Sequence, residues 1–239
     1  MSAAVVTGGA GDIGRAILAR LAEAGFVPVS WDIEPPPPGV AGWRVDVTDA
    51  SVLAGAAAET DARHGPIRAL VVNAGVLGPV ARLWEIPPAE IARVLAIDLL
   101  GALLTLNAVV PRMRAAGAQA PGPARGRIVL MGSVQGKEGT ARAAPYAAAK
   151  AGLMAAAKSL ARELAPDGIL VNVVTPTVVA GRMEASIDAD RRAELLARIP
   201  LGRFLAPGEV AEMVAWLVSP ACTFSTGAVF DLSGGRASW

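Results

Sequence analysis

The chain has 239 residues, of which 53% are hydrophobic and 18% are charged. This length and composition allow a well-buried core and exclude an extensively disordered protein. The 22 basic and 21 acidic side chains leave a formal net charge of +1, so no overall field attracts nucleic acid or an anionic membrane. The one cysteine, Cys222, excludes an intrachain disulfide and a multi-cysteine metal site, and we expect no bound metal.

The start of the chain lacks the features of a secretion signal. Met1 leads straight into an apolar strand pattern, without a basic start, a long apolar stretch and a small-residue cleavage site. We therefore expect a cytoplasmic protein. The longest apolar stretch, residues 94–110, contains Asp98, Thr105 and Asn107 and is too short and too polar for a membrane span. We interpret it as a buried helix and expect no membrane partner.

The first half of the chain alternates between apolar strand runs and helical patterns. Strands are expected over residues 3–6, 26–30, 43–47 and 69–72. Helices are expected from residue 13 up to the capping glycine Gly25, over residues 50–63 and over residues 91–113. The four prolines of residues 35–38 must lie in a loop, because proline cannot donate to a strand ladder.

The second half continues the alternation with one interruption. The expected elements are a loop over residues 117–126, strands over 127–131, 170–174 and 227–232, and helices over 146–164 and 207–218. A polar helical stretch over residues 190–198 breaks the pattern, and the segment of about residues 180–204 is a candidate substrate lid. Strands separated by helices predict an α/β fold with a doubly wound parallel sheet and right-handed crossovers.

A glycine-rich turn lies between the first strand and the first helix. Gly9, Gly11 and Gly14 satisfy the pattern G-x-G-x-x-G, which lets a backbone approach a pyrophosphate at the positive end of a helix. Asp32 follows about twenty residues later at the end of the second strand, where a carboxylate can accept both ribose hydroxyls of NAD. The sequence therefore predicts an NAD site.

The same turn resembles that of the classical short-chain dehydrogenase/reductase family, because Thr7-Gly8 and Gly14 match its T-G-x-x-x-G-x-G motif. The resemblance implies a single-domain Rossmann fold over residues 1–239. One position departs from the motif: Asp12 stands where the family has its middle glycine, and we expect its carboxylate at the surface, pointing away from phosphate. The resemblance implies that the dinucleotide is bound by Thr7, Gly8, Gly9, Gly11, Asp12, Ile13 and Gly14.

Two further segments resemble cofactor contacts of that family. The resemblance implies that Asp46 and Val47, at the end of the third strand, contact adenine, and that Asn73-Ala74-Gly75 lies beside the adenosine ribose. An aspartate after a strand is also often a helix cap, and Thr48 and Asp49 compete with Asp46 for that role. Both interpretations of Asp46 stay open at the level of the sequence.

Tyr146 and Lys150 lie four residues apart in an Ala-rich helical segment, so they project from the same helix face. A neighbouring ammonium and a positive nicotinamide ring favour the phenolate and make Tyr146 a possible general base. Ser133 follows an apolar strand at the edge where doubly wound sheets bind ligands. Without an accompanying serine, Tyr146 and Lys150 would be interpreted as ordinary surface residues of a solvated helix.

Ser133, Tyr146 and Lys150 resemble the catalytic triad of the family and its Y-x-x-x-K signature. The resemblance implies that Ser133 orients the substrate oxygen, that Tyr146 transfers the proton, and that Lys150 binds the nicotinamide ribose and favours the ionised phenol. Asp98 stands where the family has an asparagine that holds a water of the proton relay. Asp98 can accept from a water or pair with Lys150, and a purely structural role is equally open.

The segment Pro176-Thr177-Val178-Val179 resembles the P-G-x-V stretch that contacts the nicotinamide amide, with Thr177 in place of glycine. Pro176 and Val179 are the implied cofactor contacts. The threonine that the family has two residues after Val179 is replaced by Gly181, which removes a hydroxyl contact. Polar side chains near the expected mouth of the site are Gln135, Lys137, Arg142 and Arg182, which would suit a polyol or sugar acid or be ordinary surface charge.

The sequence thus predicts an NAD-dependent oxidoreductase that interconverts a secondary alcohol and a ketone. A 3-oxoacyl-thioester (acyl-carrier) reductase shares the same motifs and is the alternative enzyme. A catalytically silent dinucleotide sensor or scaffold on the same fold is the alternative from another class. From the resemblance, the apolar helix over residues 94–110 and the small side chains of the helix after Tyr146, we expect a homotetramer.

Overall fold

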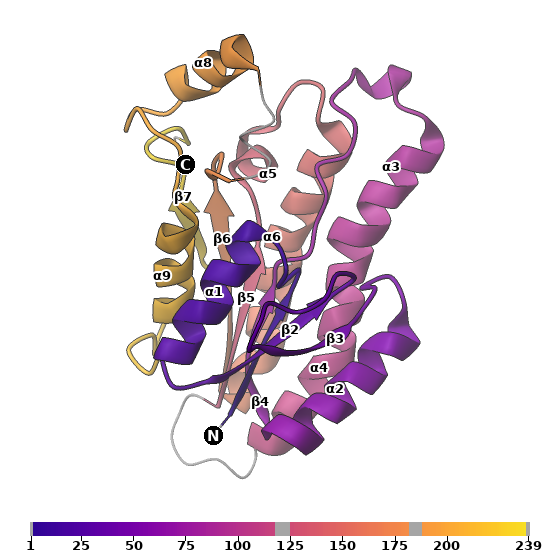
Figure 1. Cartoon of the computed structure of the whole chain (residues 1–239), viewed down its shortest axis with the longest axis vertical. Coiled ribbons are helices and arrows are strands. Elements are labelled where there is room, and N and C mark those ends of the chain that lie inside the picture. Colours follow the sequence, from indigo (N-terminus) through magenta and orange to yellow (C-terminus); the bar gives the residue numbers. More distant parts are fainter. Residues whose placement is uncertain (1, 118–124, 182–187, 238–239) are drawn as a thin grey trace.

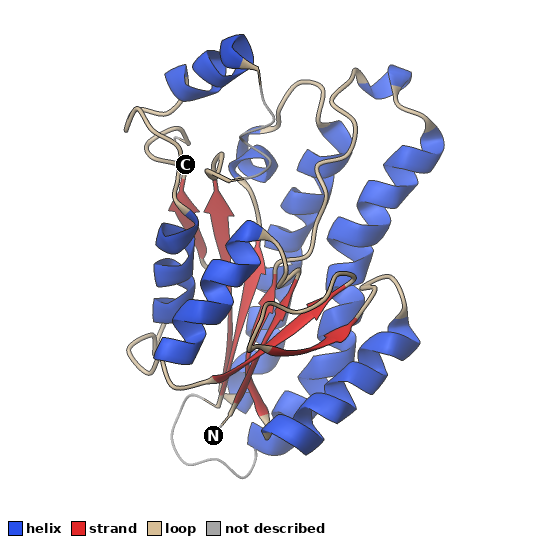
Figure 2. Ribbon diagram, in the orientation of Figure 1, coloured by secondary structure: helices blue, strands red, loops and turns tan. Residues whose placement is uncertain are grey.

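The computed structural model describes residues 2–117, 125–181 and 188–237 of the chain (Figure 1). Within these ranges a parallel sheet has the strand order β3-β2-β1-β4-β5-β6-β7 (Figure 2). Its strands are β1 (Ala3–Thr7), β2 (Val27–Asp32), β3 (Ala41–Arg44), β4 (Ile67–Val72), β5 (Gly126–Met131), β6 (Ile169–Pro176) and β7 (Val229–Leu232). The predicted doubly wound α/β fold is confirmed, and the strand order reverses between β1 and β4, where such sheets bind ligands.

Helices cover both faces of the sheet. Helices α1 (Asp12–Glu23) and α9 (Pro207–Val218) lie on one face, and α2 (Ala50–His64), α4 (Gly101–Gly117) and α6 (Ala144–Leu164) lie on the other (Figure 1). Helix α1 buries Gly14, Ile17, Leu18 and Leu21, the spacing of a single helical face. Helix α2 begins at Asp49, whose side chain accepts from the backbone N–H groups of Ser51 and Val52.

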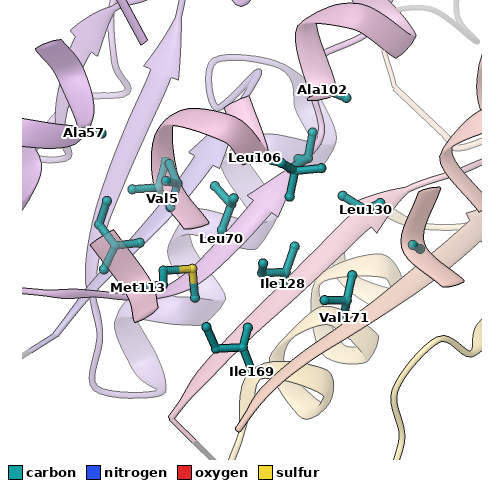
Figure 3. Packing of buried hydrophobic residues seen from close by; sticks show 14 of the residues in the cluster. Val5, Ala57, Leu70, Ala102, Leu106, Met113, Ile128, Leu130, Ile169 and Val171 are labelled. Atoms are coloured by element: carbon teal, nitrogen blue, oxygen red, sulfur yellow. The ribbon is translucent and has the colours of Figure 1, made fainter. Parts of the chain in front are cut away.

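Each face of the sheet carries its own hydrophobic core, because side chains alternate across a strand. Figure 3 shows a region of the core under α2, α4 and α6, where Leu70, Ile128, Leu130 and Val171 of the sheet meet Leu106 of α4. Every residue of β5 and β6 is buried, as expected for central parallel strands covered on both sides. The strands are therefore a rigid base for the segments that leave their carboxyl ends.

Three expectations about the elements are wrong in detail. The third strand, expected over residues 43–47, is Ala41–Arg44, so Asp46 and Val47 lie beyond its end. The helix expected over residues 91–113 is interrupted: α3 (Pro88–Leu95) and α4 are joined by a π-helical turn, η2 (Ala96–Leu100). A short helix α5 (Val134–Glu138) follows β5 and was not expected. Within the described residues, the 3-10 turn η1 (Leu83–Glu85) precedes α3, and the 3-10 turn η3 (Ala165–Asp167) follows α6.

The helical stretch Pro88–Gly117 is long and apolar enough to cross a membrane by length and composition alone. Its mean hydropathy is 2.0, and 39% of the scored window is buried. The stretch packs along the sheet beside α2 and α6 (Figure 1). It carries the fully buried Asp98, which is paired with Lys150. A buried ion pair and a sheet contact are features of a core helix, so we interpret this stretch as a core element of the fold.

The segments beyond the carboxyl ends of the strands gather at one end of the molecule. Helices α5 and α8 (Ala189–Ala197) lie there, as does the C-terminal tail (Figure 1). Helix α8 begins at Asp188, whose side chain accepts from the backbone N–H of Arg191. It covers most of the polar stretch expected over residues 190–198, and residues 182–187 of the expected lid lie outside the described residues.

Candidate active site

A cleft of about 1950 Å³ runs along the carboxyl ends of the strands. It brings together most of the residues that the sequence singled out. Those that line it are Gly8, Gly11, Asp12, Ile13, Gly14, Asp32, Asp46, Val47, Asn73, Ala74, Gly75, Ser133, Gln135, Arg142, Tyr146, Lys150, Pro176 and Val179. Thr7, Gly9 and Asp98 are buried just beneath its surface. Arg182, also singled out, lies outside the described residues.

The glycine-rich turn is shaped by a lack of space for side chains. A Cβ atom at Gly14 would overlap the carbonyl oxygen of Gly8, and a Cβ atom at Gly9 would overlap the hydroxyl of Ser30. Gly8 has a φ of 66°, which is the left-handed region that glycine adopts without strain. The turn therefore closes tightly against the first turn of α1, and its backbone faces the cleft.

Thr7 and Asn73 tie this turn to the end of β4. The Thr7 hydroxyl accepts from the backbone N–H groups of Asn73 and Ala74, at 2.9 and 3.1 Å. The Asn73 amide donates to the carbonyl oxygens of Thr7 and Gly8, each at 3.1 Å. The Thr7 side chain has no solvent exposure, so its contribution is to hold the two loops at a fixed separation.

Asp32 lies at the end of β2, with its carboxylate directed at the glycine-rich turn. The backbone N–H of Ala10 donates to Asp32 Oδ2 at 2.9 Å, and that of Glu34 donates to Oδ1 at 3.0 Å. Each oxygen retains capacity to accept a ribose hydroxyl. The sequence reasoning missed Arg15, which lines the same cleft and donates to the Ala10 carbonyl at 2.7 Å. Its position one residue after Gly14, on the first turn of α1, was the available signal.

Asp46 and Val47 line the cleft from the loop between β3 and α2. The Asp46 carboxylate accepts from the backbone N–H of Thr48 at 2.9 Å and from its hydroxyl at 2.7 Å. The cap of α2 is Asp49 and not Asp46. Asp46 is therefore exposed beside the cleft with a structural role in its own turn, and Val47 is buried against Gly101.

The expectation that Asp12 points to the surface is wrong. Asp12 is half-buried and lines the cleft, and its carboxylate lies against Gly181, which follows β6. A Cβ atom at Gly181 would come within 2.5 Å of Asp12 Oδ2. Two of the departures from the family pattern are thus in contact: the side chain gained at residue 12 occupies space that a side chain at residue 181 would need.

Ser133, Tyr146 and Lys150 come from two segments at the centre of the cleft. Ser133 follows β5 and begins α5, where its hydroxyl accepts from the Gln135 backbone N–H at 3.2 Å. Tyr146 and Lys150 lie on one face of α6, and Lys150 Nζ is 5.5 Å from the centroid of the Tyr146 ring. The Lys150 ammonium donates to the Met131 carbonyl at 3.2 Å, which fixes it at the end of β5.

Asp98 lies below this group in the π-helical turn and has no solvent exposure. Its Oδ1 accepts from the Val76 backbone N–H at 2.8 Å, and its Oδ2 is 3.3 Å from Lys150 Nζ. Burial raises the pKa of Asp98 above its ordinary value, and the Lys150 ammonium acts in the opposite direction. A Cβ atom at Gly75 would meet both Oδ2 and Nζ, at 2.9 and 3.1 Å, so glycine lets the loop after β4 cover the pair.

The polar residues expected at the mouth of the site do not all reach it. Gln135 and Arg142 line the cleft. Lys137 does not line it: its ammonium is 3.3 Å from Asp231 Oδ1, and 8% of its side chain is exposed. At the other wall Pro176, Thr177 and Val179 line the cleft, and the Thr177 hydroxyl is buried without a hydrogen-bond partner among the described residues.

The residues present fit a nicotinamide dinucleotide. The glycines at residues 8 and 14 bring the backbone of the turn close to the start of α1, where a pyrophosphate is stabilised. Asp32 supplies a carboxylate for ribose hydroxyls, and Lys150 supplies a fixed ammonium at the opposite end of the cleft.

Comparison with known proteins settles the family. Residues 9–237 match the family model described as enoyl-(acyl carrier protein) reductase. This chain belongs to the short-chain dehydrogenase/reductase family. The prediction of a dinucleotide-dependent oxidoreductase of that family is therefore confirmed at this level.

Relatives match over nearly the full length. The chain is 33% identical to the 2-dehydro-3-deoxy-L-rhamnonate dehydrogenase (NAD(+)) of Sphingomonas sp. (strain SKA58), covering 99% of this chain and 95% of the relative. It is 38% identical to the cis-4-hydroxycyclohexanecarboxylate dehydrogenase of Sinomonas cyclohexanicum, covering 97% and 95%. Among solved structures it is similar to an NAD+-bound xylitol dehydrogenase, with a TM-score of 0.89, 27% identity and 98% of each chain covered.

Proposed function

We propose that this protein is an NAD-dependent dehydrogenase that interconverts a secondary alcohol and a ketone on a small polar hydroxy compound. The observation that carries the proposal is the placement of Ser133, Tyr146 and Lys150 in the same cleft as Asp32 and the glycine-rich turn. A relative whose name specifies NAD(+) and a similar structure with bound NAD+ support the choice of cofactor.

In the oxidation direction, the Tyr146 phenolate accepts the proton of the substrate hydroxyl while the Ser133 hydroxyl donates a hydrogen bond to the same substrate oxygen. Bound NAD supplies the acceptor for the hydride that leaves the carbinol carbon. The carbon–oxygen bond becomes a carbonyl, and the proton stays on Tyr146 until it passes to solvent. In the reduction direction the Tyr146 hydroxyl returns the proton to the developing alkoxide.

The Lys150 ammonium lies over the Tyr146 ring, 5.5 Å from its centroid, where a cation is attracted to the ring face. Its position is fixed from two sides, by the Met131 carbonyl and by the Asp98 carboxylate. We propose that Asp98 acts through Lys150, as a positioning residue that balances its charge. The proton relay that the family completes through an asparagine would here pass beside a carboxyl group.

The test is a screen of secondary alcohols, polyols and hydroxy acids with NAD, in which NADH formation is followed by its absorbance. We expect turnover of at least one hydroxy compound with NAD and much slower turnover with NADP. The names of the relatives, which specify a rhamnonate derivative, a hydroxycyclohexanecarboxylate and xylitol, support a small polar substrate.

The alternative enzyme is a reductase of acyl-carrier thioesters, and the description of the matching family model favours keeping it in the test. NADH oxidation with an acetoacetyl thioester, in the absence of activity on free alcohols, would establish that alternative. Retained NADH binding with no turnover of either class would indicate a catalytically silent dinucleotide sensor.

We further propose that the protein is cytoplasmic and assembles as a homotetramer. Each chain would form one Rossmann domain over residues 1–239, with residues 180–204 as a lid over the substrate. Exposed apolar side chains support the assembly: Leu100 and Leu103 are 51% and 38% exposed on the long helix. On α6, Ala148, Ala151 and Ala155 form an exposed small-residue stripe that would allow close helix pairing. Light scattering at micromolar concentration tests the proposal, and a monomeric mass would refute it.

A further inference from the structure

We propose that the substrate is a polyhydroxylated monocarboxylic acid, whose carboxylate binds Arg142 and whose hydroxyl groups bind Gln135 and Thr140. The inference rests on the proposed dehydrogenase function and names the substrate class of the same site. It begins from the cations and the buried polar atoms that line the cleft beside Ser133 and Tyr146.

Arg142 differs from the other arginines of the cleft in having no partner among the described residues. Arg15 donates to a carbonyl, and a carboxylate lies within 4.0 Å of each of the remaining four, which are Arg93, Arg191, Arg198 and Arg236. Within the described part of the chain no hydrogen bond or ion pair satisfies the Arg142 guanidinium, and the residue is exposed on the cleft wall. Arg142 therefore presents to the cleft a positive charge that no carboxylate of the described residues pairs with.

The backbone at Arg142 is held in an unusual conformation. Its φ of 69° is the one positive value among the described residues other than glycine, and such a conformation is unfavourable for a side chain of this size. The Ala81 backbone N–H donates to the Arg142 carbonyl at 3.1 Å and fixes this geometry. Arg142 precedes Tyr146 by four residues, so its backbone lies next to the start of α6, the helix that carries Tyr146 and Lys150.

Two neutral side chains on the same segment also lack partners. Gln135 Oε1 and Thr140 Oγ1 are buried oxygens with no hydrogen-bond partner among the described residues, and both residues line the cleft. A buried acceptor without a donor is unfavourable. Rotation of the Gln135 amide and the Thr140 hydroxyl toward the cleft would let substrate hydroxyls satisfy both.

These groups lie between Ser133 and Tyr146 along the chain and line the same cleft, so a substrate bound at Ser133 and Tyr146 can reach them. A guanidinium binds a carboxylate through two parallel hydrogen bonds, and an amide and a hydroxyl suit alcohol groups. An unsubstituted acyl chain would leave Gln135 and Thr140 unsatisfied. A phosphate ester carries roughly −1.5 to −2 charges. The charge of Arg142 would not balance it, and the acidic side chains of Asp188 and Glu194, which also line the cleft, would repel it.

The experiment compares aldonates with alditols of the same carbon chain, because the two differ in carrying a carboxylate or a neutral CH2OH group at one end. The pairs are xylonate with xylitol and gluconate or galactonate with the matching hexitol, each with NAD. We expect the wild-type kcat/KM to be at least about tenfold higher for an aldonate than for its alditol, the effect of one charged hydrogen-bonded pair.

Arg142→Gln should lower kcat/KM for the aldonate by about 10- to 100-fold and leave that for the alditol nearly unchanged. Arg142→Lys should restore some of the lost activity. Arg93→Gln is the matched control, because Arg93 lines the same cleft but already pairs with Glu90 at 2.8 Å, and it should keep the aldonate preference. Unchanged melting temperatures would show that the variants fold.

Gln135→Leu and Thr140→Val test the hydroxyl contacts. Each should lower kcat/KM for an aldonate by about tenfold while sparing a monohydroxy acid of the same length. Titration calorimetry of each aldonate into the enzyme with NADH bound measures the aldonate Kd and does not depend on turnover.

Several results would overturn this inference. One is a higher wild-type kcat/KM for alditols or sugar phosphates than for aldonates. Another is an equal loss of kcat/KM for the aldonate and the alditol in Arg142→Gln. The third is that the wild-type enzyme neither binds nor turns over any aldonate. NADH formation from any neutral secondary alcohol would, in each case, leave the proposed dehydrogenase function standing. Failure to bind NADH or to oxidise any alcohol would refute that function instead.

Discussion

The two ends of the cleft are built by different means. At the cofactor end the geometry follows the path of the backbone: glycines at residues 8, 9 and 14 leave no room for side chains, and the Thr7 and Asn73 side chains hold the loops by hydrogen bonds to backbone groups. At the catalytic end it is set by side chains from separate elements, with Lys150 held between Asp98 and the Met131 carbonyl. Cofactor affinity should therefore be most sensitive to substitutions that add side-chain volume to the glycine-rich turn. The catalytic rate should be most sensitive to substitutions that change the functional groups of the catalytic side chains.

The largest effect is expected at the catalytic end. Tyr146→Phe removes the proton donor but little surface, so it should lower kcat by ~10²–10⁴-fold, the usual contribution of a general acid–base group. NADH affinity, measured by fluorescence titration, should stay near the wild-type value. Lys150→Ala should lose both rate and NADH affinity. Wild-type turnover by Tyr146→Phe on every accepted substrate would show that the assignment is wrong.

The next effect concerns cofactor choice at the other end. The Asp32 carboxylate should repel a 2′-phosphate and give a preference for NAD over NADP on the order of 10²-fold in kcat/KM. Asp32→Ser with Ile33→Arg should narrow or reverse that preference, because Ile33 is 57% exposed beside the cleft.

Arg15 supplies a control for this test. Its guanidinium already lies against the turn that Asp32 holds, so Arg15→Ala in the Asp32→Ser background should reduce the gain with NADP. Equal kcat/KM for the two cofactors in the wild-type enzyme would contradict the role of Asp32.

Added volume in the glycine-rich turn gives a smaller effect. Gly14→Ala forces a Cβ atom into the Gly8 carbonyl oxygen, so the turn must shift and NADH affinity should fall by about tenfold or more. Gly11→Ala is the matched control in the same turn, because its Cβ atom would meet the nearest atom at an ordinary 3.5 Å. Isothermal titration with NADH measures both, and equal losses would argue against a steric cause.

The smallest effect is the pH dependence that Asp98 adds to stability. Because burial raises its folded-state pKa, Asp98 contributes stability below the unfolded-state pKa of 3.8, and this contribution is lost as the pH rises through the folded-state value. Over that window Asp98→Asn should gain stability relative to wild type, by up to about 1.4 kcal/mol per pH unit. Urea unfolding at several pH values measures the difference, and a constant offset would exclude the pKa shift.

The sequence alone predicted the residues of the two ends better than the contacts that surround them. The glycine spacing, Asp32 and the Tyr146–Lys150 pair are local patterns, because they lie within one turn, at one strand end or on one helix face. The contact of Asp12 with Gly181 and the pairing of Lys137 with Asp231 join segments far apart in the chain. No periodicity in the sequence encodes such contacts, since they arise only when the elements pack.

The secondary-structure elements show the same difference between features set by local sequence and features set by packing. Apolar runs identified the buried strands β1, β4, β5 and β6, but the edge strand β3 is half-exposed, and its limits follow from pairing with β2 and not from its own hydropathy. The short helix α5 depends on the cap that Ser133 provides, and it contains two charged residues and a glycine that give no helical periodicity.

The π-helical turn at Ala96–Leu100 has a consequence for how this chain aligns with other proteins. In a regular α-helix each residue advances by about 100°, so a residue added or removed within it rotates everything after it by that angle. A π-helical turn takes up one extra residue in a wider turn, so the residues that follow keep their facing. Helix α4 thus directs Ala102, Leu106, Val109 and Met113 at the core. Deleting one residue within the turn should let the helix continue regularly and leave that stripe on the sheet, whereas the same deletion within α4 would rotate the stripe away. Among homologues, a one-residue gap should therefore be tolerated in this turn and not in α4.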